Sequence, residues 1–507
     1  MNHLSEISWH LGDASHAEVH AALSSCFTIH RGAETSAVAQ YLDDADAHLW
    51  RAGLLLRHSA KQVHLTEGEV VVGAATLQPG ERFWWDYSAG PLQDRLRERV
   101  GVRALLPVVA LTVRHTELAL CDANQKTVVR ARLTESLADG RCDQPGLHYL
   151  TLKPLRGYDA AFAEAMHCVQ ALVRSEVDLR ARTLLAQHGI GRFKARRAAP
   201  MPVTNAMPTE QAVRAMAHIM LEGAQQQVGG VIDDIDTEFL HAYRVHLRKA
   251  RSLVSLLNKS LPQATIARVK PRLAAMAGAT NRLRDLDVYL LAQHQYRALL
   301  PAGFDAGMAE LAALVGQQRT QEQARVAIHL GSARYAADVA ACLAELASPP
   351  ALETPAASRP VLYVLKRQLL KRYAAVKAMS SLIHPHCLDD DIHAVRIELK
   401  KLRYLIEFFA SMLPKKRSAK LLADLKNIQG VLGDFNDFSV QVDFLGSYID
   451  DGRIALSRAV SGLTAILHVK KMAQRERIFA ALGDYFSENR AIEFTLLFEV
   501  DKSGDAK

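Results

Sequence analysis

The pattern of apolar and polar residues changes about a third of the way along the chain. From about residue 48 to 153, short segments with partial alternation, such as ERFWWDYSA and LPVVALTVRHTELALC, are separated by Gly, Asn, Asp and Pro. This pattern predicts strands joined by turns, in an antiparallel sheet or barrel. Residues 159–189 instead have a helical period, which predicts one long helix that ends near Gly189. The first domain is therefore expected to be α+β.

Nearly all of the chain after Thr209 has the composition and the period of helices. Two proline-containing segments, 190–208 and SPPALETPAASRP at 348–360, interrupt the pattern. The expected organisation is an α+β domain with a barrel-like antiparallel sheet at 1–189, a basic linker at 190–208, and an all-α region at 209–507 made of two pseudo-symmetric helical bundles at 209–347 and 361–490.

One basic pattern occurs twice in the helical region, at a constant offset of 152 positions. Its spacings of three, four and three place the cations along one side of a helix, beside a separate apolar ridge. The register continues without insertion to Asp285 and Asp437. We therefore expect two copies of one helical unit, whose basic helices face each other across a pseudo-twofold axis. The repeated residues are His241, Arg244, Arg248, Lys249 and Arg251 in the first copy, and His393, Arg396, Lys400, Lys401 and Arg403 in the second.

A basic stripe on a helix can be a solvated surface or a binding site for an anion. The first stripe contains no acid from His241 to Leu257, and like charges this close repel each other unless an anion joins them. In the second copy Glu407 lies four residues after Arg403, which predicts an ordinary helical ion pair and no catalytic role. Recurrence of the same side-chain types at the same phase favours an anion site.

The composition adds a preference for an acidic partner. The chain has 507 residues, 49% of them hydrophobic, and a formal net charge of +8. Two or three folded units and a polyphosphate, nucleic-acid or anionic-membrane partner are therefore expected. Six scattered cysteines without a C-x-x-C pair argue against a disulfide framework and a zinc cluster. No signal-peptide pattern and no apolar run of about twenty residues is found, so we expect a cytoplasmic protein, and of these three classes of partner we do not expect the membrane.

The repeated motifs resemble the CHAD family, the histidine-containing α-helical domains. Each half of such a domain carries an H-x-x-R…R/K-x-x-R helix followed by an RD or ND signature, as do IHAVRIELKKLRYLIEFF with LGDFNDFSV, and FLHAYRVHLRKARSLVSLL with LRDLDV. The match spans about 209–490 and departs from the family chiefly at Asn281, where a glycine is usual. The resemblance implies inorganic polyphosphate binding in a basic channel between the two halves, often with recruitment to polyphosphate granules.

A linear polyanion has no sequence to read, so its expected receptor is a row of cations. Arginine supplies paired donors, lysine a point charge, and histidine a donor that strengthens on protonation. Neither a metal nor another cofactor is expected. The preceding helix of the second half either extends the channel or forms a solvated face with Lys366, Arg367, Lys371, Arg372 and Lys377.

Four acids follow the stripes: Asp285, Asp287, Asp434 and Asp437. Paired carboxylates can bind a metal, but beside so many cations we expect them to hold the Arg and Lys side chains in place. Tyr404 is expected to be a core residue or, alternatively, a hydroxyl contact to phosphate.

The first domain resembles the CYTH, or triphosphate tunnel, fold, which hydrolyses triphosphate with metal-holding glutamates inside a β-barrel. The family's opening E-x-E-x-K falls on residues 6–10, where Glu6 is the one carboxylate, and its late E-x-E falls on residues 149–151. Too few oxygen ligands remain for metal-bound triphosphate. We expect a degenerate, non-catalytic domain for dimerisation or docking. The likeness rests on Asp43, Leu49, Gly53, Leu56, Arg57 and Arg114.

Three functions remain open: polyphosphate binding without catalysis, an inorganic triphosphatase with a polyphosphate-binding module, and nucleic-acid binding. The missing carboxylates argue against the second. Sparse aromatic residues and the lack of reading motifs argue against the third. A homodimer is one assembly left open.

Two smaller features have both a structural and a binding interpretation. The adjacent Trp84 and Trp85 offer an aromatic pair that can stack a base or a ring, but they are expected to divide between core and interface, because neighbouring strand residues point to opposite faces. A solvated tether is expected for the basic linker residues Arg192, Lys194, Arg196 and Arg197.

Overall fold

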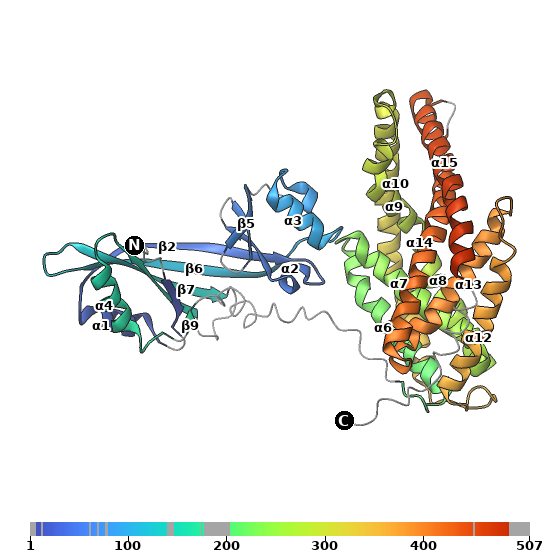
Figure 1. Ribbon diagram of the computed structural model, residues 1–507, viewed down its shortest axis with the longest axis horizontal. Coiled ribbons are helices and arrows are strands. Elements are labelled where there is room, and N and C mark those ends of the chain that lie inside the picture. Colours follow the sequence, from blue (N-terminus) through green and yellow to red (C-terminus); the bar gives the residue numbers. More distant parts are fainter. Residues whose placement is uncertain are drawn as a thin grey trace. The chain divides into compact units, whose positions relative to one another are not determined.

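The structure is a computed structural model of the whole chain. It describes residues 7–11, 14–59, 62–67, 70–76, 80–138, 147–173, 175–176, 203–449 and 452–485. The chain divides into two compact units, Met1–Ala198 and Ala199–Lys507, whose elements are labelled in Figure 1. Within the described residues, no helix is both long and apolar enough to cross a membrane.

A nine-stranded antiparallel sheet is the centre of the first unit in the residues that the structure describes, in the order β5-β4-β3-β2-β6-β7-β8-β1-β9. Its long strands are β2 (Thr28–Asp43), β6 (Leu106–Cys121) and β7 (Thr127–Ala138). The predicted α+β class and antiparallel sheet are confirmed. The shorter strands are β1 (Ile7–His10), β3 (Leu54–Ser59), β4 (Gln62–Glu67), β5 (Val70–Thr76), β8 (Leu147–Pro154) and β9 (Ser175–Glu176).

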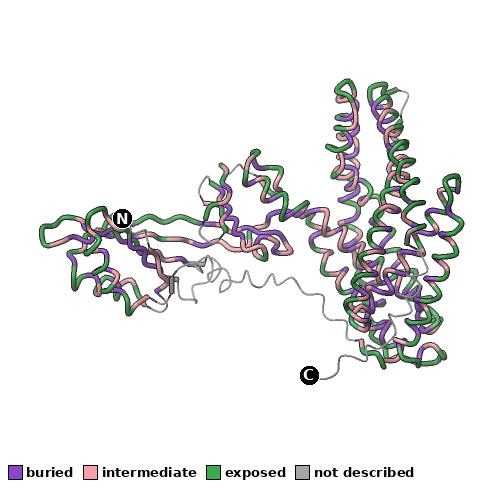
Figure 2. Tube along the Cα trace, viewed as in Figure 1, coloured by how far each residue is buried: buried purple, intermediate pink, exposed green. Residues whose placement is uncertain are grey.

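Two separate hydrophobic cores hold helices against this sheet. In one core, α1 (His16–Ser24) and α4 (Asp159–Val169) pack on β6, β7 and β8 through buried side chains that include Leu23 and Phe162. In the other, α2 (His48–Arg51) and α3 (Pro91–Val100) pack on β3 and β4. Figure 2 shows the buried positions of each element in purple.

Two elements of the first unit were predicted wrongly. The segment ERFWWDYSA contains the 3-10 helix η1 (Trp84–Asp86), because the Asp86 carboxylate accepts hydrogen bonds from the backbone N–H groups of Arg82 and Phe83 and closes a turn. The helix predicted at 159–189 ends at Val169, and β9 then pairs with β1. Most of the remainder of that segment, and residues 190–202 of the expected linker, lie outside the described residues.

The second unit repeats its elements at the offset found in the sequence. Helices α7 (Thr237–Leu256) and α13 (Asp389–Phe408) begin and end 152 positions apart. The predicted repeat and the all-α class are confirmed. The other helices are α6 (Thr209–Ile232), α8 (Gln263–Gly278), α9 (Asn281–Arg297), α10 (Asp305–Leu330), α11 (Ala333–Ala347), α12 (Val361–Ser380), α14 (Lys415–Gly446) and α15 (Ile454–Tyr485), with 3-10 turns η3 (Asn258–Ser260), η4 (Ala302–Phe304) and η5 (Ala410–Met412).

The two halves of the second unit share their cores. One cluster combines Tyr243 and Leu247 of α7 with Leu399 and Leu402 of α13, all fully buried. Another joins α9 and α10 to α14 and α15. Both clusters cross between the halves, and the first brings α7 and α13 into direct contact.

Candidate anion-binding site

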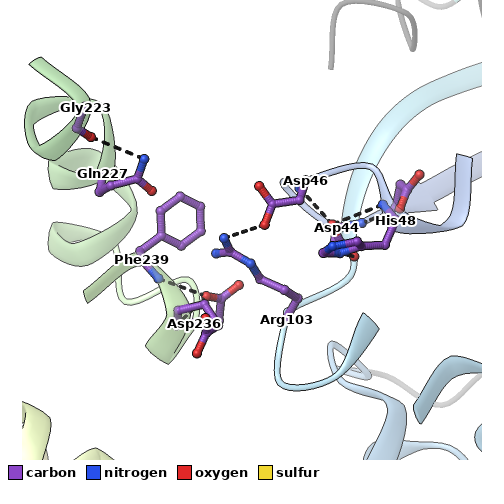
Figure 3. Close-up of polar contacts among 10 residues, drawn as sticks. Asp44, Asp46, His48, Arg103, Gly223, Gln227, Asp236 and Phe239 are labelled. Atoms are coloured by element: carbon purple, nitrogen blue, oxygen red, sulfur yellow. Dashed lines mark hydrogen bonds and ion pairs between the residues drawn. The ribbon is translucent and has the colours of Figure 1, made fainter. Parts of the chain in front are cut away.

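An apolar ridge positions both basic helices, and a capping residue fixes the start of the first one. Asp236 begins α7 by accepting hydrogen bonds from the backbone N–H groups of Glu238 at 2.9 Å and Phe239 at 3.3 Å (Figure 3). Leu240 of α7 and Ile392 of α13 lie at the start of the ridges and are almost fully buried. With these ridges in the shared core, the cations lie along the shoulder of each helix.

Cations from both stripes act on one another. Burial, followed by the charges of Arg396 and Arg248, lowers the pKa of the Lys400 ammonium to about 8. Burial also lowers the pKa of Arg396, again with Arg248 among the contributing charges. Arg248 extends from α7 and the other two from α13, so the structure brings the middle of the two predicted stripes together.

In the first copy, a cation that the sequence reasoning missed joins the stripe. Arg284 of α9 is the largest charge contribution that lowers the pKa of His241, after burial itself. Burial lowers the pKa of Arg244, and Arg284 and Arg248 lower it further while Asp285 raises it. Arg284 is itself the arginine of the RD signature in LRDLDV, which was the available signal.

Arg244 also has a structural role at a place where the two copies differ in backbone. Its Nη1 donates to the carbonyl of Ala277 at 3.0 Å, to Thr280 Oγ1 at 2.9 Å and to Asn281 Oδ1 at 2.8 Å. These bonds give the polar acceptors at the end of α8 a hydrogen-bond donor at the point where the helix breaks before α9. The second copy continues through the equivalent position, Gly433, as the single helix α14.

In the second copy the equivalent positions are less strongly charged. Asn436, the counterpart of Arg284, lies 2.9 Å from His393 Nδ1 through its amide oxygen. Arg396 lies 3.8 Å from Asp437 and, within the described residues, makes no helix-end hydrogen bonds of the kind that Arg244 makes. A cavity of about 420 Å³ is lined by His393, Arg396 and Asn436. His468 and Lys471 of α15 also line it.

Two further cations of the second stripe have acidic partners. Glu398 accepts hydrogen bonds from Arg372 at 2.8 Å and from Lys401 at 2.5 Å, and it was not recognised in the sequence although it lies three residues before Lys401. The predicted pair between Arg403 and Glu407 is confirmed at 3.6 Å. The second stripe is therefore partly neutralised.

The remaining predicted residues are spread over several surroundings. Asp285 faces Arg244 and Arg284, and burial raises its pKa against their influence. Asp287 is buried and accepts a hydrogen bond from Arg319 of α10 at 2.9 Å. Lys249 is half-buried, whereas the exposed residues are Arg251, Lys366, Arg367, Lys371, Lys377 and Asp434.

Tyr404 lies in the core, which is the first of the two predicted alternatives. It is 4% exposed, and its ring stacks on Phe408 with the ring centroids 5.8 Å apart. A hydroxyl contact to phosphate from this position stays untested.

The first unit places the two segments that were aligned with the CYTH carboxylates side by side. Strands β1 and β8 pair so that Ser8 faces Thr151 and His10 faces Tyr149. Ser8 Oγ and Thr151 Oγ1 are 2.7 Å apart, and the rings of His10 and Tyr149 are 5.4 Å apart. Glu6 lies outside the described residues. Of the described positions that the predicted alignment assigns to carboxylates, Ser8 and Thr151 carry hydroxyl groups and Tyr149 carries a phenol ring.

A group of metal-ligand type in the first unit, Asp44, Asp46 and His48, consists of residues that pair with neighbours. Asp44 Oδ2 lies 2.8 Å from His48 Nδ1, and Arg103 donates to Asp46 at 2.5 Å (Figure 3). Asp43, next to them, accepts from the backbone N–H groups of Leu49 and Trp50, and burial raises its pKa to about 6. The cluster therefore organises the turn from the end of β2 into α2.

Comparisons with known proteins place the site in a recognised domain. A structure titled "Crystal structure of the CHAD domain from the plant Ricinus communis" is 23% identical and covers 57% of this chain and 96% of that chain, with a TM-score of 0.48. PptA from Streptomyces chartreusis is 23% identical over 55% of this chain and 100% of that chain, with a TM-score of 0.39. The search of curated proteins finds no match. The CHAD domain family model matches residues 215–446, so this part of the chain is a CHAD domain, as its repeated motifs predicted.

Proposed function

We propose that the CHAD domain binds inorganic polyphosphate along the seam between α7 and α13. The observation that carries the proposal is the gathering of Arg248, Arg396 and Lys400, where burial and then the charges of Arg396 and Arg248 lower the pKa of Lys400 to about 8. A folded chain that keeps like charges together in this way gains free energy when an anion enters between them. A linear polyphosphate supplies one negative charge for each cation along such a row.

Unsatisfied donors support the same ligand. Arg284 Nη1, Arg396 Nε and Arg403 Nε are buried and have no hydrogen-bond partner within the described residues. Buried N–H groups without an acceptor are unfavourable, particularly on a charged group. Side-chain rearrangement around phosphate oxygens would supply the missing acceptors, because guanidinium groups bind phosphate through paired N–H donors.

We further propose that the protein is non-catalytic, cytoplasmic and associated with polyphosphate granules. Its first unit then serves as a platform for dimerisation or docking. Ser8, His10, Tyr149 and Thr151 support this reading of the first unit, since none supplies a carboxylate for a metal. The test is release of phosphate from tripolyphosphate with Mg²⁺ or Mn²⁺. Turnover well above a blank that is lost in Glu6→Ala would instead establish a triphosphatase.

Binding to long-chain polyphosphate, measured across a salt titration with duplex DNA and tripolyphosphate as competitors, tests the main proposal. We expect selective binding whose logarithmic affinity falls steeply with the logarithm of salt concentration, as several phosphate contacts require. Equal preference for DNA would replace polyphosphate by a generic polyanion, and equal competition by tripolyphosphate at matched phosphate concentration would redirect the proposal to short oligophosphates.

A further inference from the structure

Two cysteine thiols that are far apart in the sequence meet in the first unit. Cys26 lies just after α1, next to its C-cap residue Ser25, and Cys168 lies in the last turn of α4. Their Sγ atoms are 2.7 Å apart. The scattered spacing of the cysteines gave no sign of a pair in the sequence.

The two helices hold this approach through packing that does not depend on the thiols. Leu23 and Phe27 around the end of α1, and Ala165 and Val169 of α4, belong to one buried core, and each is at most 7% exposed. A disulfide bond is about 2.05 Å long, so closure requires a relative movement of the sulfur atoms of less than about 1 Å. Side-chain rotation can supply a movement of that size without unfolding either helix.

We propose that Cys26 and Cys168 form an oxidation site that closes to a disulfide when the protein meets a hydroperoxide. The site is independent of polyphosphate binding, because it lies in the other unit and uses none of the stripe residues. It applies to the dithiol form, which is the form expected in a reducing compartment.

The exposure of the two thiols sets the order of the steps. Cys26 is exposed and Cys168 is half-buried. Burial, together with the hydrogen bond to Cys26, raises the pKa of the Cys168 thiol to about 11. Cys168 therefore stays protonated while the thiolate of Cys26 attacks the peroxide first.

The electrons balance in two steps. The Cys26 thiolate attacks one peroxide oxygen, the O–O bond breaks, and the products are the Cys26 sulfenic acid and hydroxide. The Cys168 sulfur then attacks the Cys26 sulfur, the S–O bond breaks, and the departing hydroxide takes the Cys168 proton as water. Overall two thiols lose two electrons to one hydroperoxide, and a thiol reductant reverses the change.

The full-length protein treated with stoichiometric hydrogen peroxide tests this assignment. We expect the loss of two titratable thiols, a mass decrease of about 2 Da from the two hydrogens removed, and one cross-linked peptide that contains Cys26 and Cys168 and disappears on reduction. Cys26→Ser and Cys168→Ser should each abolish the peptide. Cys121→Ser, which alters a buried cysteine of the same unit, should leave it unchanged.

Two results would overturn the proposal. One is a sulfinic acid at Cys26 with no cross-linked peptide, which would mean that Cys168 does not reach the sulfenic acid. The other is a cross-link from Cys26 to a different cysteine, including Cys142, which lies outside the described residues. Thermal unfolding gives a second readout, because the bond joins residues 142 positions apart and should raise the midpoint of the first unit by several degrees.

Discussion

Arg248 of α7 lies close enough to Lys400 of α13 to add to the effect of burial in lowering the pKa of its ammonium group, and the two residues occupy the same position in the two copies of the repeat. A residue meets its own counterpart only near the axis that relates the copies. The pair therefore marks the middle of the seam between the basic helices, where an extended anion would contact both halves of the domain together.

Charge reversal at this pair should weaken polyphosphate binding. Arg248→Glu combined with Lys400→Glu removes two cations and adds two acids at the centre of the seam, so we expect at least about a tenfold loss of affinity and a salt slope lower by about two. Circular dichroism should show unchanged helix content.

The matched control for this variant changes the net charge equally at a distance from the stripes. Lys270 of α8 and Arg334 of α11 are both exposed, and their replacement by Glu should reduce affinity much less. Retained affinity in the Arg248→Glu, Lys400→Glu protein would refute the seam as the site.

Polyphosphate binding should be accompanied by the uptake of a proton by Lys400 near pH 8. The free domain holds the pKa of Lys400 at about 8, and a bound polyanion restores it toward the ordinary lysine value of about 10.4. Affinity should therefore be highest below pH 8 and fall by up to about tenfold per pH unit between these values. Titration in buffers of different ionisation enthalpy measures the proton. Lys400→Arg should remove this component, and an unchanged pH profile in that variant would assign the proton elsewhere.

Removal of an internal acid should have the opposite effect on affinity. Glu398 accepts hydrogen bonds from Arg372 and Lys401, so Glu398→Gln leaves a similar shape but releases two cations to a ligand. We expect tighter polyphosphate binding, by severalfold at low salt and less at high salt, since the gain is electrostatic. If affinity falls instead, Glu398 positions the two cations rather than competing for them.

Arg244 and Arg396 occupy equivalent positions, but we expect Arg244 to contribute chiefly to stability and Arg396 chiefly to polyphosphate binding. Arg244 makes three hydrogen bonds at the end of α8, whereas Arg396 has a single ion pair at 3.8 Å among those found in the structure. Arg244→Ala should lower the free energy of unfolding by about 1–3 kcal/mol. Arg396→Ala should chiefly lower polyphosphate affinity. Chemical denaturation and binding measured on both proteins would show whether the effects separate in this way.

The contact between α10 and α15 gives a test of the shared core. A Cβ atom added at Gly307 would lie 2.2 Å from the backbone carbonyl oxygen of Ala455, so Gly307→Ala must push the two helices apart and should destabilise the domain by about 1–3 kcal/mol. Gly316 lies in the same helix with no atom near its Cβ position. Gly316→Ala should stabilise the protein by about 0.5–1 kcal/mol. Equal effects would mean that the helices are not in close contact.

The sequence could predict the repeated unit because the feature that matters there is local. The phase of His241, Arg244 and Arg248 along one helix defines a face, and the same phase recurs 152 positions later. It could not predict that the two halves share their cores, since helical period identifies an apolar face but not the helix against which it packs. Likewise the partner of Asp287, Arg319 of α10, follows from tertiary packing alone.

The errors in the first unit have a different cause. In ERFWWDYSA the aromatic residues favour a strand, but the Asp86 carboxylate offers the backbone a turn instead, and the local hydrogen bonds prevail. The inward and outward division of the tryptophans was still found, with Trp84 against the core and Trp85 42% exposed. In the segment after Asp159, helical period continued past the point where the chain forms β9 and pairs with β1.

The constant offset between the copies also makes the molecule its own reference. Arg284 and Asn436 stand at equivalent places beside His241 and His393, and they differ in charge. Exchange of these two residues leaves composition and net charge untouched while it moves the positive group from one copy to the other. Such a transposed chain separates the influence of where a charge is placed from the influence of how much charge is present, a distinction that single substitutions in a domain without internal repetition do not allow.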